Sequence, residues 1–148
     1  MDEIKHIMVP VDFSENSQKI LRSAAGFAAK FGARLSVVFV VQSFDDYSGF
    51  FVPHMSILEF EEDMIKSASD KMKGFVAETL SGATSCSPAI LSGDVVEQIN
   101  DFARKQGVDL IIMGTHGYKG LEKILFGSVA EQVVKTAPCP VLTINPYR

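Results

Sequence analysis

Five short apolar runs alternate with four longer amphipathic stretches along the 148 residues of this chain. Each run has the length of a strand, and each stretch between runs repeats apolar residues at helical spacing. This alternation predicts right-handed βαβ units and one parallel sheet with helices on both faces. The expected strands are 7–11, 35–41, 89–91, 110–113 and 141–144. The expected helices are 15–31, 57–80, 95 to near 107, and 128–136.

Local signals support the ends of the first helix. Ser14 stands directly before the periodic stretch and is typical of an N-cap, while Gly32 stands where a C-terminal stop is expected. Pro88 suits the beginning of the weak third strand, since proline cannot donate to the middle of a ladder.

The length of 148 residues is typical of one α/β domain, here expected to span 1–148. No apolar run reaches the roughly 20 residues of a membrane span, so no membrane is expected. The formal charge of -4 argues against nucleic-acid binding, which normally needs a basic face. The N-terminus shows no signal-peptide pattern, which predicts a cytoplasmic protein whose Cys86 and Cys139 are free thiols.

The fourth apolar run leads directly into Gly114-Thr115-His116-Gly117, and Gly127-Ser128 follows. Glycines at a strand-to-helix junction let the backbone approach a ligand closely or reach a positive φ. A helix that begins with serine adds unpaired N–H groups and the positive end of a dipole. These residues therefore predict a site for a phosphate-bearing ligand.

The first strand ends in a second polar segment, Pro10-Val11-Asp12-Phe13-Ser14. Open parallel sheets bind ligands beyond the carboxyl ends of strands, where the winding reverses. If the first and fourth strands are neighbours, Asp12 and the glycine loop face each other across one crevice.

Two familiar phosphate loops are excluded by their residues. No lysine follows Gly117 or Gly127 as a Walker loop requires, and no glycine follows the first strand as a dinucleotide fingerprint requires. The pattern G-x-x-G-x9-G-S at 114–128 instead resembles that of the universal stress protein family. Val-Pro-Val-Asp-x-Ser at 9–14 and the ending at 137–142 share the resemblance, which covers the whole chain.

The resemblance implies a Rossmann-like five-stranded parallel sheet of order 3-2-1-4-5. Members with the complete glycine motif generally bind ATP. By this resemblance the base and ribose would contact the ends of the first and second strands. The ribose and first phosphates would contact the glycine loop, and the outer phosphates would contact the last helix. The residues concerned are Pro10, Val11 and Asp12; Val40; Met113, Gly114 and Gly117; and Gly127, Ser128 and Val129.

Structural roles compete with these assignments. Asp12 can serve as a residue at a helix N-terminus, the glycines can form a tight turn, and Ser128 can be a helix cap. His116 has neither metal-ligand spacing nor a recognisable nucleophile beside it, which favours a positioning or stacking role over acid–base catalysis. The aromatic stretch 42–55 is open between a packed loop, a lid and a subunit contact.

The leading hypothesis is a cytoplasmic ATP-binding regulatory protein that holds nucleotide without efficient turnover. ADP or AMP are alternatives as the resident ligand, and Mg²⁺ or Mn²⁺ would accompany a triphosphate. Similar proteins form homodimers through the last strand, here Val141–Ile144. The competing hypotheses are a slow ATPase or phosphoryl-transfer enzyme, and an interaction module that needs no nucleotide.

Overall fold

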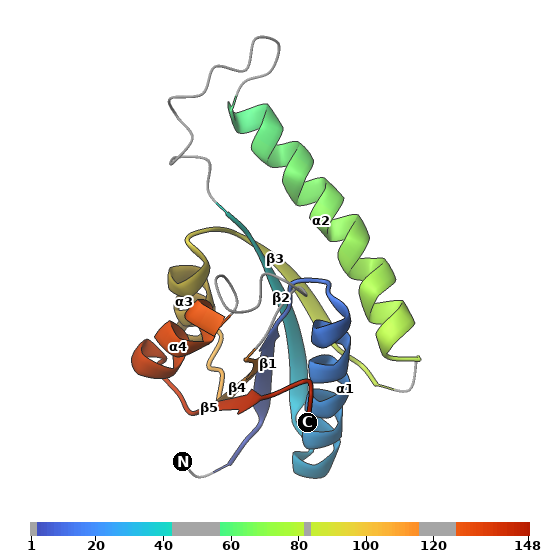
Figure 1. Ribbon diagram of the computed structural model, residues 1–148, viewed down its shortest axis with the longest axis vertical. Coiled ribbons are helices and arrows are strands. Elements are labelled where there is room, and N and C mark those ends of the chain that lie inside the picture. Colours follow the sequence, from blue (N-terminus) through green and yellow to red (C-terminus); the bar gives the residue numbers. More distant parts are fainter. Residues whose placement is uncertain (1–2, 43–56, 82–83, 116–126) are drawn as a thin grey trace.

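The computed structural model describes residues 3–42, 57–81, 84–115 and 127–148. Strands and helices alternate along the chain, as the sequence pattern predicts (Figure 1). In chain order they are β1 (His6–Pro10), α1 (Glu15–Phe31), β2 (Arg34–Gln42), α2 (Ile57–Thr79), β3 (Ser87–Gly93), α3 (Val95–Lys105), β4 (Leu110–Gly114), α4 (Gly127–Thr136) and β5 (Val141–Ile144).

The strands form one sheet of order β3-β2-β1-β4-β5, and every neighbouring pair is parallel. The predicted fold class and strand order are therefore confirmed. The winding reverses at β1, which pairs with β2 on one side and with β4 on the other. β1 and β4 thus stand side by side, as the predicted crevice requires.

Helices cover both faces of the sheet, with α1 and α2 on one face and α3 and α4 on the other (Figure 1). Alternate strand residues supply the two cores, because successive side chains of a strand point to opposite faces. In β1, Ile7 and Val9 join the core beneath α1 and α2, while Met8 joins the core beneath α3 and α4. All three are fully buried.

The ends of α1 follow the predicted capping. The Ser14 side chain accepts a hydrogen bond from the Ser17 N–H at 3.1 Å, and Gly32 takes a left-handed φ of 64° at the other end. Ala24, Ala25 and Ala28 are buried at helical spacing, which lets the helix lie close to the sheet.

Two boundaries differ from the predicted ones in a way that matters. β3 is longer than predicted, because it is a half-exposed edge strand whose Ser, Pro and Gly residues carry little strand signal. α4 begins at Gly127, so Ser128 lies inside the first turn and is not the residue that starts the helix.

Candidate functional site

The carboxyl end of β1 opens into the turn that leads to α1. Beyond the last strand residue, the Val11 N–H still donates to the Val38 carbonyl of β2 at 2.8 Å, so this backbone continues the ladder. The chain then turns at Asp12 and Phe13 before Ser14 caps the helix. The turn is therefore held between the sheet and the start of α1.

Asp12 has one carboxylate oxygen engaged and one available. Its Oδ1 accepts hydrogen bonds from the Ser14 N–H at 3.0 Å and from the Ser17 hydroxyl at 2.6 Å. Its own N–H donates to the Ser17 Oγ at 2.9 Å. Oδ2 has no partner among the described residues. The structural role considered for Asp12 is thus real, and it leaves one charged acceptor for a ligand.

Phe13 adopts a left-handed backbone conformation with φ of 66°. This conformation is unfavourable for a bulky residue and calls for compensation from the surroundings. The ring stacks on Phe39 of β2 at 4.4 Å between centroids and meets Phe75 of α2 edge-on at 5.5 Å. These ring contacts hold the turn that presents Asp12.

A pocket of about 440 Å³ opens at this edge of the sheet. Five of the residues predicted for the ligand site line it together: Pro10, Val11, Asp12, Val40 and Val129. The other described lining residues come from the turn, from β2 and from α2 and α3; they are Phe13, Val38, Phe39, Val41, Gln42, Met64, Ser67, Ala68, Lys71, Val95 and Ile99.

The pocket wraps around the carboxyl end of β2. Five consecutive residues from Val38 to Gln42 line it, and successive strand residues face opposite sides of the sheet. Val38 and Val40 accordingly pack with the core of α3 and α4, and Phe39 with the core of α1 and α2. The pocket therefore has one side beneath α3 and α4 and another beside α2.

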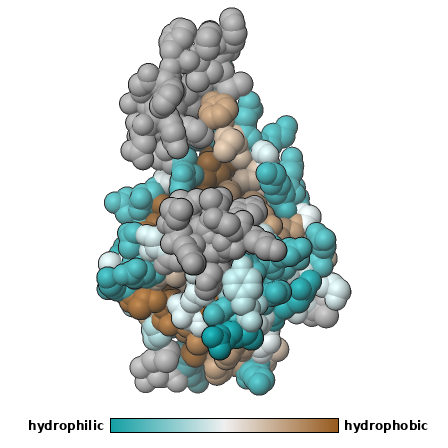
Figure 2. Space-filling view, viewed as in Figure 1, coloured by the Kyte–Doolittle hydropathy of each residue, from teal (hydrophilic) through white to brown (hydrophobic). Residues whose placement is uncertain are grey.

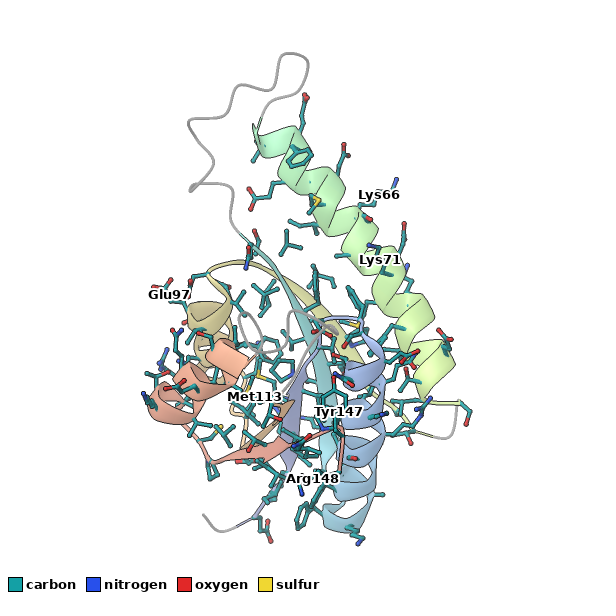
Figure 3. All side chains as sticks on the ribbon, viewed as in Figure 1. Lys66, Lys71, Glu97, Met113, Tyr147 and Arg148 are labelled. Atoms are coloured by element: carbon teal, nitrogen blue, oxygen red, sulfur yellow. The ribbon has the colours of Figure 1, made fainter. Side chains whose placement is uncertain are left out.

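The remaining predicted residues are placed differently. Met113 is fully buried inside the fold, between the sheet and α4 (Figure 3), and is not among the described lining residues. Gly114 is the last residue of β4 and pairs with Ile144, so its backbone is extended and does not use a left-handed conformation. His116 and Gly117, and the aromatic stretch beyond Gln42, lie outside the described residues.

The start of α4 presents backbone N–H groups near the pocket. Gly127, Ser128 and Val129 form its first turn, whose N–H groups have no intrahelical acceptor. The Ser128 Oγ accepts from the Gln132 side chain at 3.3 Å, one helical turn further on. Of these three residues, Val129 is the one that lines the pocket.

Sequence reasoning missed the wall that α2 contributes. Met64, Ala68 and Lys71 recur at helical spacing, so one face of the helix carries them to the pocket. This spacing was a usable signal, although a neighbouring apolar stripe that includes Ala68 and Met72 forms the core contact and masks it.

Three titratable groups with shifted pKa values lie outside the pocket lining. Burial lowers the pKa of His6, an effect that Arg34 reinforces and that the Gln106 carbonyl and Asp109 oppose. Burial raises the pKa of the thiols of Cys86 and Cys139, both of which are free. These cysteines are therefore in the less reactive thiol form.

The described residues contain no cluster of three His, Cys, Asp or Glu side chains that could hold a metal ion. Asp12 is the only carboxylate among the described residues that line the pocket. The described helices also include none that is long and apolar enough to cross a membrane.

The fold is a doubly wound parallel α/β sheet, and its pocket lies at the carboxyl ends of β1 and β2, where open sheets of this kind commonly bind ligands. The sequence model of the universal stress protein family matches residues 3–145. The chain belongs to the universal stress protein family.

Two curated relatives agree with this assignment. A universal stress protein of Methanocaldococcus jannaschii is 36% identical over 146 residues, covering 95% of this chain and 82% of the relative. A universal stress protein A homolog of Coxiella burnetii is 37% identical over 142 residues, covering 95% of each chain.

Solved structures share the fold and include nucleotide complexes. The universal stress protein UspA of Lactobacillus plantarum superposes with a TM-score of 0.77 at 26% identity, covering 98% of this chain and 100% of that one. The Archaeoglobus fulgidus protein in complex with dAMP gives 0.68 at 26%, covering 95% and 98%. Two structures at 20% and 21% identity share the fold alone; they are described with cAMP and with AMP bound.

Proposed function

We propose that this protein binds an adenine nucleotide, ATP above all, in the pocket at the carboxyl ends of β1 and β2. The observation that carries the proposal is the convergence of Pro10, Val11, Asp12, Val40 and Val129 on that pocket. The dAMP complex of a relative from the same family supports the class of ligand.

The base and ribose take the end formed by β1 and β2. Pro10 and Val11 line the base, and the backbone of Val40 contacts adenine. Asp12 accepts from a ribose hydroxyl through Oδ2, which leaves its Oδ1 bonds to Ser14 and Ser17 intact. A carboxylate suits this end because it accepts with charge assistance and would repel phosphates.

The phosphates take the end formed by β4 and α4. Met113, Gly114 and Gly117 hold the ribose and first phosphates through the backbone, and the extended Gly114 permits a close approach. Gly127, Ser128 and Val129 donate first-turn N–H groups to the outer phosphates, with help from the Ser128 hydroxyl. His116 positions the ligand without transferring protons.

Holding nucleotide, rather than consuming it, is the proposed role. Efficient phosphoryl transfer needs charge clamps and an oriented nucleophile around the γ-phosphate. Among the described residues the pocket supplies one carboxylate, Asp12, at the sugar end, and one lysine, Lys71, on α2. Neither stands at the proposed phosphate end. Mg²⁺ or Mn²⁺ would accompany ATP as a phosphate-bound ion.

The decisive test is mass spectrometry of small molecules released from freshly purified protein, followed by melting curves with ATP, ADP, AMP and GTP. An adenine nucleotide at 100 times its dissociation constant should stabilise the fold by about 2.7 kcal/mol. GTP should give a smaller shift. The absence of a released nucleotide together with no shift from any of the four would refute binding, and steady release of ADP from ATP would refute storage without turnover.

We also propose a cytoplasmic homodimer that pairs through β5. This strand is the edge of the sheet, and Val141, Leu142 and Ile144 are half-buried within one chain. An uncovered apolar edge normally needs a partner. Ile144 accepts from the Thr115 N–H at 3.0 Å, so Thr143 directs its N–H away from β4. Thr143→Pro should therefore yield a monomer in sedimentation equilibrium, while an unchanged dimer would exclude this interface.

A further inference from the structure

The side of the pocket beside α2 differs in chemistry from the side assigned to the nucleotide. We call it the α2 lobe; its residues are Phe13, Phe39, Val41, Met64, Ser67, Ala68 and Lys71. It lies on the face of the sheet covered by α1 and α2, whereas Val40, Val95 and Val129 lie on the opposite face. The end of β2 therefore separates the two sides.

The α2 lobe has an aromatic floor. Phe13 and Phe39 stack at 4.4 Å, and the left-handed backbone of Phe13 lies directly after Asp12. One strained residue thus brings Asp12 and a ring to neighbouring parts of the pocket. Strained backbone of this kind clusters at functional sites.

The wall of the lobe is fixed to the sheet. The Ser92 hydroxyl of β3 donates to the Glu61 carboxylate of α2, and Ser92 pairs in register with Val41. This bond joins the first half of α2 to the strand end beside the lobe. Figure 2 shows hydrophobic surface between the upper part of α2 and the body of the molecule. Met64, which lines the pocket from α2, is 40% exposed.

Lys71 supplies the charge of the lobe. It comes from the middle of α2 (Figure 3) and forms no ion pair with another described residue. Asp12 also lines the pocket, and its remaining acceptor Oδ2 is assigned above to the nucleotide. The lobe therefore presents an apolar surface, one hydroxyl from Ser67 and one ammonium group.

We propose that the α2 lobe is a second binding compartment, for a small amphipathic carboxylate. The apolar part of this ligand packs on Phe13, Phe39 and Met64, and its carboxylate pairs with Lys71. A cationic ligand is disfavoured by Lys71, and a strongly hydrated anion without an apolar part would gain little from this wall. The proposal does not depend on the nucleotide, which takes mainly the α3 and α4 side and borders the lobe at Val11.

The test uses octanoate and 1-octanol as probes that differ only in the head group, titrated into the full chain by calorimetry. Octanoate should bind saturably to one site, and Lys71→Met should weaken it about tenfold, as expected for a lost charged hydrogen bond. The dissociation constant of 1-octanol should change by less than about twofold in this variant. Lys73→Met, on an exposed position of the same helix outside the lobe, is the matched control.

A second variant fills the lobe without touching the core. Ser67 is exposed on α2, so Ser67→Trp should fold like the wild type in circular dichroism and should abolish octanoate binding. The melting shift from AMP should persist in Ser67→Trp. Four results would overturn the second compartment. They are non-saturable octanoate binding to the wild type, equal octanoate affinity in Ser67→Trp, equal octanoate affinity in Lys71→Met, and displacement of octanoate by AMP. Octanoate binding without any AMP shift would instead overturn the proposed nucleotide function alone.

Discussion

Polar side chains at the amino and carboxyl edges of the parallel sheet differ in how they are hydrogen-bonded. At the amino edge, Asp109 Oδ2 accepts from the N–H groups of Lys5 at 2.9 Å and His6 at 3.0 Å. The His6 ring lies 3.1 Å from the Gln106 carbonyl and 2.7 Å from the Ser36 Oγ. At the carboxyl edge, the turn is strained at Phe13, and Asp12 retains a free carboxylate oxygen.

This contrast indicates that the amino edge contributes mainly to stability and the carboxyl edge mainly to ligand binding. At the amino edge a buried histidine is bonded through both ring nitrogens, and these bonds contribute to the free energy of folding. Groups at the carboxyl edge are held in position, but Asp12 keeps one carboxylate oxygen without a partner among the described residues. Substitutions at the amino edge should therefore lower stability and spare binding, and those at the carboxyl edge should do the reverse.

The largest effect is expected from His6→Ala. The side chain is 2% exposed, and its loss leaves the Ser36 hydroxyl without its ring partner and the Gln106 carbonyl with only the Arg34 guanidinium at 3.3 Å. The free energy of unfolding should fall by about 3 kcal/mol, from unmade hydrogen bonds and an unfilled space. Urea denaturation measures this loss. Lys5→Ala, at an exposed neighbour, should stay within about 0.5 kcal/mol.

Gly127→Val should have the converse effect at the carboxyl edge. A side chain at the start of α4 would occupy the proposed phosphate position, so the stabilisation of about 2.7 kcal/mol by saturating nucleotide should disappear. The melting temperature of the free protein should change little. A variant that keeps the nucleotide shift would remove the start of α4 from the binding site.

Asp12→Asn separates the two roles of that residue. The amide oxygen can still accept from Ser14 and Ser17, so stability should change by less than about 1 kcal/mol. The lost charge should weaken nucleotide binding about tenfold, which corresponds to roughly 1.4 kcal/mol. Calorimetric titration with AMP gives the affinity. Equal affinity in the variant would mean that Oδ2 does not face the ribose.

The smallest effect is a pH dependence of stability that originates at the amino edge. Burial lowers the pKa of His6 in the folded chain below its ordinary value of 6.5. As the pH falls, the unfolded chain therefore takes up a proton first, and stability declines below about pH 6.5 until the folded-state pKa is passed. Urea midpoints for the wild type should fall over this range more steeply than those of His6→Gln. Parallel curves would show that the pKa of His6 is the same in the folded and unfolded chains.

Sequence patterns were sufficient to predict the helices and strands of this molecule and their order in the sheet. Ser14, Gly32 and the continuous apolar run of β2 each act through their near neighbours, and the structure confirms them. The half-exposed strand β3 was underestimated because its burial depends on being at the edge of the sheet. Local patterns thus specify elements better than they specify where an element lies.

The parts of the site that escaped sequence reasoning depend on distant contacts. The left-handed backbone of Phe13 is compensated by Phe39 and Phe75, far along the chain, so no local rule predicts it. Likewise, Lys71 reaches the pocket only because α2 lies against β2 and β3. Asp12 was found because a polar residue after a buried strand is informative by itself.

The central place of β1 also sets an order of assembly. β1 pairs with β2, the next strand in the chain, whereas its contact with Asp109 joins residues 103 positions apart. Closing so long a loop is slow, so the chain up to β3 should condense before β4 and β5 dock. The pocket spans this late seam, with Pro10 and Asp12 from the early half and Val129 from the late one. A ligand bound there would contact both halves and stabilise their association, and its release would destabilise the contacts that formed last.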